Sequence, residues 1–226
     1  MSMNRVTALV LIAIATLSAD ADAQIRRQQA PQGPPAYWVS VGVGAFSANN
    51  VTDGDSQTTW DFGNATSPQY RASVERNFSN GIALGVAGTY VKAPIRHSSS
   101  VGSVDAEVNV YSLGVNFESA GGVGFHQVYG GSLGMTRYAN FKRKSDGAEL
   151  APTEAVNAIS GAFSYGFGYG LSQRTAIVGV YDIGLVYHNR DGLTSDQRNT
   201  LVPRTLRVGL RHGFGFRAQG GVRRRR

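Results

Sequence analysis

From Tyr37 onward, the chain alternates apolar residues with small or polar residues in stretches of roughly ten, separated by turn residues. Alternation with a period of two indicates β-strands, and its repetition at this length is typical of a membrane-spanning barrel. Val, Ile, Leu, Phe and Tyr share one face of each stretch, and Gly, Ser and charged residues share the other. We expect eight strands, at about 37–46, 69–78, 81–92, 104–117, 122–135, 156–169, 175–188 and 204–217.

The fourth expected strand changes phase along its length. Tyr111, Leu113, Val115 and Phe117 form one apolar face, whereas the segment 104–110 has the reverse phase. A β-bulge near Val110 would produce this change, and so would an extension of the strand above the bilayer. The pattern leaves both explanations open.

The connections between the expected strands alternate in length. Tight turns at 79–81, 119–121 and 170–173 alternate with long connections at about 47–68, 93–107, 136–155 and 189–203. Short periplasmic turns, long extracellular loops and an even number of strands are typical of bacterial outer-membrane barrels. The pattern predicts that both chain termini are periplasmic.

Alternation alone does not separate a membrane barrel from a soluble lipocalin-like barrel, whose apolar faces point inward. Two features favour the membrane. Gly makes up 29 of 226 residues, and the Gly- and Ser-rich polar faces suit a crowded, narrow interior. Tyr and Phe gather near the strand ends, as in the aromatic girdles of membrane barrels. We expect an all-β fold, an eight-stranded antiparallel up-and-down transmembrane β-barrel over residues 37–217.

The N-terminal segment has the features of a signal peptide. Arg5 precedes an apolar run at 6–15, and Ala21-Asp22-Ala23 matches an A-x-A cleavage site, which predicts a cleaved signal over 1–23. The apolar run is shorter than the ~20 residues of a membrane-spanning helix. A Pro- and Gln-rich linker is expected at 24–36 and a basic tail at 218–226.

The strand pattern, the loop alternation and the end of the chain resemble the small OmpA-type outer-membrane barrels, without the peptidoglycan-binding domain of their larger members. The resemblance covers about 37–217 and implies the outer membrane of a Gram-negative bacterium, with outer-membrane lipid and lipopolysaccharide as partners. The segment 207–216, RVGLRHGFGF, resembles the terminal strand that the barrel assembly machinery recognises. Its candidate signal residues are Gly209, Phe214 and Phe216, although the chain continues to RRRR.

Charge and cysteine content limit the partners and the kinds of binding site that this chain can have. The net charge is +7, and much of the excess lies in Arg223–Arg226, which offers a contact to anionic envelope components. Export argues against nucleic acid as a partner. The absence of Cys excludes disulfides and thiolate metal sites.

Charged residues on the polar strand faces are expected in the lumen: Arg71, Glu75, Asp182, Arg207 and Arg211, with Asp105 and Glu107 as further candidates. Buried charges need partners. Arg207 and Arg211 are expected to meet Asp182, and Arg71 or Arg211 to meet Glu75. Such a network is either a structural plug or a gated polar path, and an eight-stranded barrel is only wide enough for its own side chains.

Catalytic candidates are few. His97 precedes Ser98, Ser99 and Ser100, but no acid lies at a matching spacing, and the same holds for His188. No residues have the spacing of metal ligands. We expect no enzyme activity, no cofactor and no metal.

The first long connection contains Trp60 and Phe62 among polar residues. Exposed aromatic side chains there would serve adhesion or receptor binding; alternatively, the pair packs on the barrel rim. We hypothesise a non-enzymatic outer-membrane barrel with a structural, envelope-integrity role and surface interactions through its long loops. The alternatives are a narrow porin-like channel or transporter for small solutes and a soluble, exported lipocalin-like binding barrel.

Overall fold

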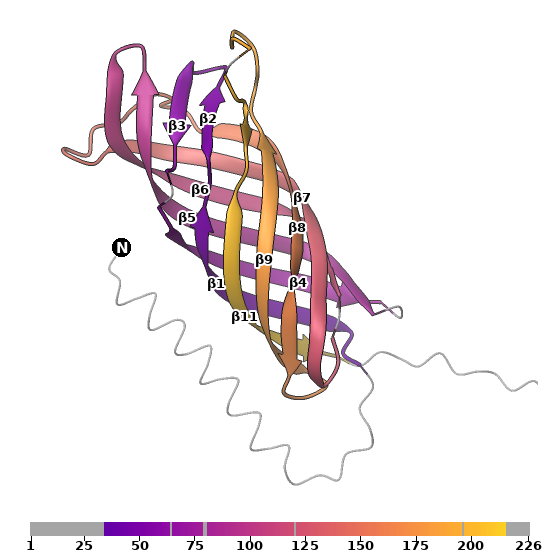
Figure 1. Ribbon diagram of the computed structural model, residues 1–226. Helices are drawn as coiled ribbons and strands as arrows, with labels where there is room; N and C mark the ends of the chain where they lie inside the picture. The colour runs from indigo at the N-terminus through magenta and orange to yellow at the C-terminus, as the bar shows by residue number, and fades with distance from the viewer. Residues whose placement is uncertain (1–33, 64, 79–80, 120, 196, 216–226) are drawn as a thin grey trace, which may run out of the picture. The chain divides into compact units, whose positions relative to one another are not determined.

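Eight antiparallel strands close into a barrel in this computed structural model, which describes residues 34–63, 65–78, 81–119, 121–195 and 197–215 (Figure 1). Each wall strand pairs with the next one along the chain, and the first pairs with the last, so the barrel has no open edge. The expected fold is confirmed. The wall strands are β1 (Tyr37–Ser47), β4 (Ser67–Asn77), β5 (Ile82–Ser99), β6 (Gly102–Ser119), β7 (Gly124–Arg143), β8 (Val156–Gly170), β9 (Thr175–Tyr187) and β11 (Arg204–Phe214).

The two ends of the barrel differ. At the short-turn end, short connections join β4 to β5, β6 to β7 and β8 to β9, and β1 begins beside the end of β11. At the extended end, β5 and β6 continue together as one long hairpin (Figure 1). A second hairpin, β2 (Asn50–Asp53) and β3 (Thr58–Asp61), lies there along β5, and β10 (Thr200–Leu201) pairs with β9.

The strand positions agree with the sequence pattern except at the extended end. The residues expected as a long loop at 93–107 belong mostly to β5 and β6, which stay paired until Ser99 meets Gly102. Part of the connection expected at 136–155 likewise belongs to β7. The prediction of loops there is wrong, because these strand segments carry polar residues outside and apolar residues inside, the reverse of a membrane strand.

Strand β6 shows this reversal directly. Its even-numbered residues point into the barrel along its whole length. Near the extended end these inward residues are apolar, as at Val108 and Val110, whereas Glu118 near the short-turn end is charged. On the outward face, Leu113 and Val115 are 64% and 55% exposed. Apolar side chains therefore change sides near Val110 without a break in the backbone alternation.

The nearby irregularity belongs to the partner strand. The register between β6 and β7 shifts between Glu107 and Asn109, opposite Asn140, which has a φ of 58°. The extra residue of this bulge lies in β7. Of the two explanations that the sequence left open, the phase change of β6 thus follows from its extension beyond the apolar part of the barrel, and the bulge near this height belongs to β7.

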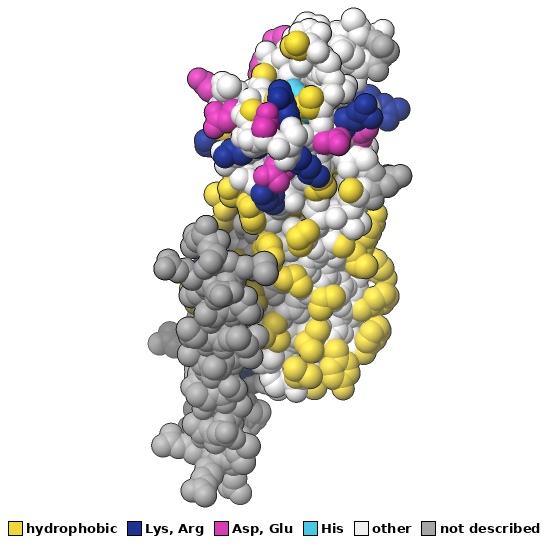
Figure 2. Space-filling view, turned by 90° about the vertical axis from the view of Figure 1, so that its left-hand side faces the viewer, with side chains coloured by type: hydrophobic (Ala, Val, Ile, Leu, Met, Phe, Trp, Pro, Cys, Tyr) yellow, Lys and Arg dark blue, Asp and Glu magenta, His cyan; other side chains and the backbone are white. Residues whose placement is uncertain are grey.

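A belt of exposed apolar side chains covers the outer surface between the two ends. Figure 2 shows these side chains over one face of the barrel, with charged side chains gathered beyond them toward the extended end. Every wall strand contributes; members include Val41, Val74, Leu84, Val86, Leu113, Val115, Leu133, Ile159, Phe163, Ile177, Ile183, Leu206 and Val208.

This belt has the properties of a lipid-facing surface. Soluble monomers rarely expose apolar patches of more than a few hundred Å², whereas membrane barrels carry a continuous apolar band. Tyr70, Tyr90 and Tyr111 lie toward its extended side: the first two rings are stacked at 6.5 Å between centroids, and the last two are tilted at 5.1 Å. The apolar faces point outward, so the soluble lipocalin-like arrangement is not formed. Among the described residues, no helix is long and apolar enough to cross a membrane.

Candidate functional site: the lumen

Five charged side chains form an ion-pair layer inside the barrel: Glu75, Glu118, Asp182, Arg207 and Arg211. Arg211 places Nη2 at 2.6 Å from Oε2 of Glu75 and Nη1 at 3.2 Å from Oε1 of Glu118. Arg207 places Nη2 at 3.2 Å from Oε2 of Glu118 and Nε at 2.8 Å from Oδ2 of Asp182. Glu118 therefore links the two arginines, and the layer crosses the lumen between β4, β6, β9 and β11.

Neighbouring side chains add hydrogen bonds and a ring contact to this layer. Ser73 and Asn116 donate hydrogen bonds to Oε1 of Glu75, at 2.9 and 2.8 Å. The guanidinium of Arg211 lies 4.8 Å from the ring centroid of buried Trp38, a cation–π arrangement. Because buried charges are tolerated only when paired and hydrogen-bonded, this network fixes the side chains that fill the lumen.

The structure brings together four of the five luminal charges expected from the sequence, namely Glu75, Asp182, Arg207 and Arg211. Arg71 stands outside the layer and lines a cavity instead. Sequence reasoning missed Glu118, although it lies on the polar face of β6, two residues beyond Asn116. The charge at Glu118 was obscured because the expected strand ended at Phe117.

The two further candidates do not enter the lumen. Asp105 is exposed, and Glu107 forms an ion pair with Lys92 at 2.7 Å on the outer side of the β5–β6 hairpin. Their expected luminal position is wrong, because the polar face of these strands turns outward at the extended end.

An apolar cluster closes the lumen toward the extended end. Trp60 of β3 is fully buried, with its ring centroid 5.2 Å from Tyr138, 4.7 Å from Phe141 and 5.2 Å from His188. Phe62 is also buried and packs edge-on against Phe46. Of the two alternatives for Trp60 and Phe62, exposure for receptor binding is wrong and packing is nearer the structure: both rings anchor the first connection inside the barrel.

Asp53 and His188 form a buried pair beside this cluster. Oδ1 of Asp53 lies 3.6 Å from Nδ1 of His188, and Ser56 donates to Oδ2 from its backbone N at 3.0 Å and its Oγ at 2.7 Å. Burial raises the pKa of Asp53, but the neighbouring His188 and the hydrogen bonds from Ser56 outweigh it and hold that pKa below its ordinary value. The pair connects the β2–β3 hairpin to the end of β9.

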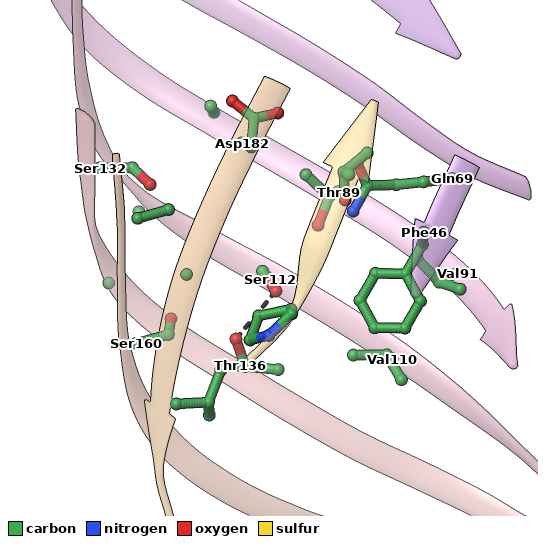
Figure 3. A pocket seen from close by; sticks show the side chains of 18 of the residues that line it. Phe46, Gln69, Thr89, Val91, Val110, Ser112, Ser132, Thr136, Ser160 and Asp182 are labelled. Atoms are coloured by element: carbon green, nitrogen blue, oxygen red, sulfur yellow. Dashed lines mark hydrogen bonds between the residues drawn. The ribbon is translucent and has the colours of Figure 1, made fainter. Parts of the chain in front are cut away.

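A cavity of about 100 Å³ lies between the ion-pair layer and the apolar cluster. Figure 3 shows Phe46, Val91 and Val110 together on one side of it, and hydroxyl groups of Ser112 and Thr136 joined by a hydrogen bond of 2.9 Å. Arg71 and Asp182 line it as well.

No catalytic constellation forms around the sequence candidates. His97 is buried, and its Nε2 contacts the backbone oxygen of Ala151 at 2.5 Å. Within the described ranges, no group of three His, Cys, Asp or Glu side chains is placed to hold a metal ion.

The remaining candidates lie at the chain ends. Gly209 faces Gly42 in the β1–β11 pair, and a Cβ on Gly209 would lie 2.9 Å from the carbonyl oxygen of Val41, so the close strand contact accounts for glycine there. Phe214 ends β11 and is exposed. Phe216, the signal segment 1–23 and the basic tail with Arg223–Arg226 lie outside the described residues.

Comparison with the solved structure of Neisserial surface protein A gives the same fold. Neisserial surface protein A matches with a TM-score of 0.55 at 16% identity, over 81% of this chain and 100% of that protein. OprG, an outer membrane protein of Pseudomonas aeruginosa, matches with a TM-score of 0.44 at 12% identity, over 81% of this chain and 98% of OprG. The outer membrane protease OmpT of Escherichia coli matches with a TM-score of 0.39 at 8% identity, over 83% of this chain and 99% of OmpT. Neither a protein-family model nor a curated protein sequence matches.

Closed strand pairing, an outward apolar belt and a polar lumen therefore define a membrane-spanning barrel, and the chain has the fold of the small eight-stranded outer-membrane β-barrels. One such fold supports unrelated activities, so the role has to be argued from the lumen and the extended end.

Proposed function

We propose that this protein is a non-enzymatic outer-membrane barrel that supports envelope integrity and makes surface interactions through its extended end. In this proposal the signal peptide at 1–23 directs export, the short-turn end and both termini face the periplasm, and the extended end faces outward. Outer-membrane lipid and lipopolysaccharide surround the apolar belt, and no cofactor takes part.

The closed lumen carries the proposal. A solute that crosses the barrel would have to pass the ion-pair layer, with four N–O contacts of 2.6 to 3.2 Å, and then the apolar cluster around Trp60. Both closures are built from wall strands or from segments packed on them. An eight-stranded barrel has little room for a path around such side chains. A structural role fits this lumen better than a diffusion channel does.

The extended end supports the surface role. Its outward side carries charged residues in opposite pairs, such as Lys92 with Glu107 and Arg143 with Asp146. Its inner side packs around Trp60, which keeps the hairpins ordered beyond the lipid belt. An ordered polar platform of this kind suits contacts with lipopolysaccharide headgroups or with another surface. Recognition of Gly209, Phe214 and Phe216 by the assembly machinery, and contacts of Arg223–Arg226 with anionic envelope components, remain part of the proposal.

Two measurements test it. Purified protein in planar bilayers should give no stable single-channel conductance; reproducible conductance steps that change in Arg211→Ala would replace the structural role by a channel. Cells that lack the protein should become sensitive to detergent, and the wild-type chain should restore resistance. Unchanged detergent sensitivity in the deletion strain would contradict the envelope role.

The surface role has its own control. A variant with Lys92→Gln, Arg96→Gln, Asp105→Asn and Glu107→Gln removes outward charges but leaves the inner packing in place. It should restore detergent resistance while cell binding to lipopolysaccharide-coated surfaces falls. Equal binding by both proteins would argue against a surface role for this face.

A further inference from the structure

The central cavity is rich in hydrogen-bond donors. Its wall carries hydroxyl groups from five strands, of which Ser112 and Thr136 bond to each other at 2.9 Å. Thr89, Ser132 and Ser160 make no side-chain hydrogen bond to any described residue. Figure 3 shows their side chains around the same space. These groups have hydrogen-bonding capacity left for a guest. The hydroxyl-bearing wall residues are Thr89, Ser112, Ser132, Thr136, Ser160, Ser164 and Thr205.

Arg71 adds a positive charge to this wall without a direct partner. It makes no ion pair and no hydrogen bond with any described residue, although it lies on the inward face of β4. A guanidinium has five N–H donors and no acceptor. Arg71 is partly buried and lines the cavity, so groups inside the cavity can supply acceptors for its guanidinium.

The nearest acidic wall residue is already engaged. Oδ2 of Asp182 accepts from Arg207 at 2.8 Å, and Oδ1 accepts from Ser164 at 2.5 Å. The ion-pair layer has three carboxylates and two guanidiniums, so it carries one excess negative charge. Arg71 offsets this charge only from a distance, without a direct contact. The wall hydroxyls can both donate and accept hydrogen bonds, so they do not by themselves select the charge of a guest. Of the two charged residues that line the cavity, Asp182 is paired and Arg71 is not, which favours an anion over a cation.

We propose that this cavity is a binding site for a small inorganic anion, either a halide or an oxyanion of phosphate size, anchored by the guanidinium of Arg71. Its acceptor atoms match the donors of Arg71 and of the wall hydroxyls. The volume of about 100 Å³ sets the size limit, because pockets for larger organic ligands span roughly 300–1,000 Å³. The site is independent of the surface role.

The test is a nuclear magnetic resonance titration of the full mature chain in detergent micelles. Phosphate, and separately bromide, replaces gluconate at constant ionic strength, because gluconate is too large for the cavity. The side-chain Nε–Hε signal of Arg71 and the amides of Ser112 and Thr136 should shift with saturation. Signal shifts that rise linearly with anion concentration and never saturate would overturn the proposal. Shifts confined to basic residues on the outer surface would overturn it as well.

The same titration of matched variants provides a second test. Arg71→Gln should weaken the apparent affinity by roughly tenfold or more, because it removes a charge-assisted anchor. Arg71→Lys should keep part of the affinity, and Arg137→Gln, at an exposed outward position of β7, should keep all of it. If Arg71→Gln does not fold, Ser160→Val, which narrows the cavity, takes its place and should also weaken binding. Unchanged affinity in the cavity variant would refute the site.

Discussion

Removal of Arg211 is the sharpest perturbation of the ion-pair layer. Its guanidinium contacts Glu75 at 2.6 Å and Glu118 at 3.2 Å, and only 3% of its side chain is exposed. Arg211→Met keeps most of the aliphatic volume but leaves two buried carboxylates without that partner. Breaking a buried ion pair in this way typically destabilises by about 3–5 kcal/mol.

The exposed Lys92–Glu107 pair is the natural control. Its N–O distance of 2.7 Å is as short, but its side chains are 54% and 32% exposed. Exposed ion pairs contribute about 0–1 kcal/mol, so Lys92→Met should have little effect. The two pairs have nearly the same N–O distance, so the difference in unfolding free energy between the two variants reports the effect of burial.

The assay is reversible urea unfolding in lipid vesicles, followed by tryptophan fluorescence and by gel mobility without boiling. Arg211→Met should lower the free energy of unfolding by several kcal/mol, and the double variant Glu75→Gln with Arg211→Met should recover part of that loss because fewer charges stay unpaired. If Arg211→Met were as mild as Lys92→Met, the layer would not be the buried network described above.

Three further predictions concern other parts of the molecule. Leu113→Arg on the lipid-facing belt should destabilise the barrel by roughly 2–4 kcal/mol, whereas Ser103→Arg on the outward side of the extended hairpin should be neutral; equal effects in vesicle unfolding would contradict the belt. Trp60→Ala should cost about 3–5 kcal/mol of local packing and make the extended end sensitive to protease while the barrel still migrates as folded; a protease-resistant variant would argue against the anchor. Because the folded pKa of Asp53 lies below its ordinary value, its stabilisation is present above that value and disappears as the pH falls through the folded pKa. Protease protection of the extended end should therefore fall in acid, and Asp53→Asn should remove this pH dependence.

The period-two pattern predicted the fold because the barrel wall has one chemical face in lipid and one in the lumen. The strands from Tyr37 to Phe214 follow that rule closely in the belt. It fails at the extended end, where Val108 and Val110 turn inward around Trp60 while Glu107 turns outward. There the solvent on the outside changes from lipid to water, and the pattern of one strand does not reveal where that change occurs.

The luminal site was predictable in part for the same reason. Strand alternation identified four members of the ion-pair layer as inward-facing. The expected contact between Arg71 and Glu75 does not form because both residues lie on β4, four positions apart, which is about 13 Å along a strand. That spacing already stands in the sequence, whereas the pairing of Arg211 with Glu75 depends on the height of residues on different tilted strands. The burial of Trp60 depends on a hairpin within a connection, which no alternation of wall strands specifies.

The central claim is that the outer face of each strand passes from lipid to water near the height of Val110, and the absence of Cys makes a direct measurement straightforward. Single cysteines at outward positions of β6, labelled with an environment-sensitive fluorophore, can be tested in vesicles that contain brominated lipid. Labels at Leu113 and Val115 should be strongly quenched, whereas labels at Ser103, Asp105 and Glu107 should remain unquenched and open to aqueous iodide. Unquenched, iodide-accessible labels at Leu113 and Val115 would contradict a membrane-spanning barrel.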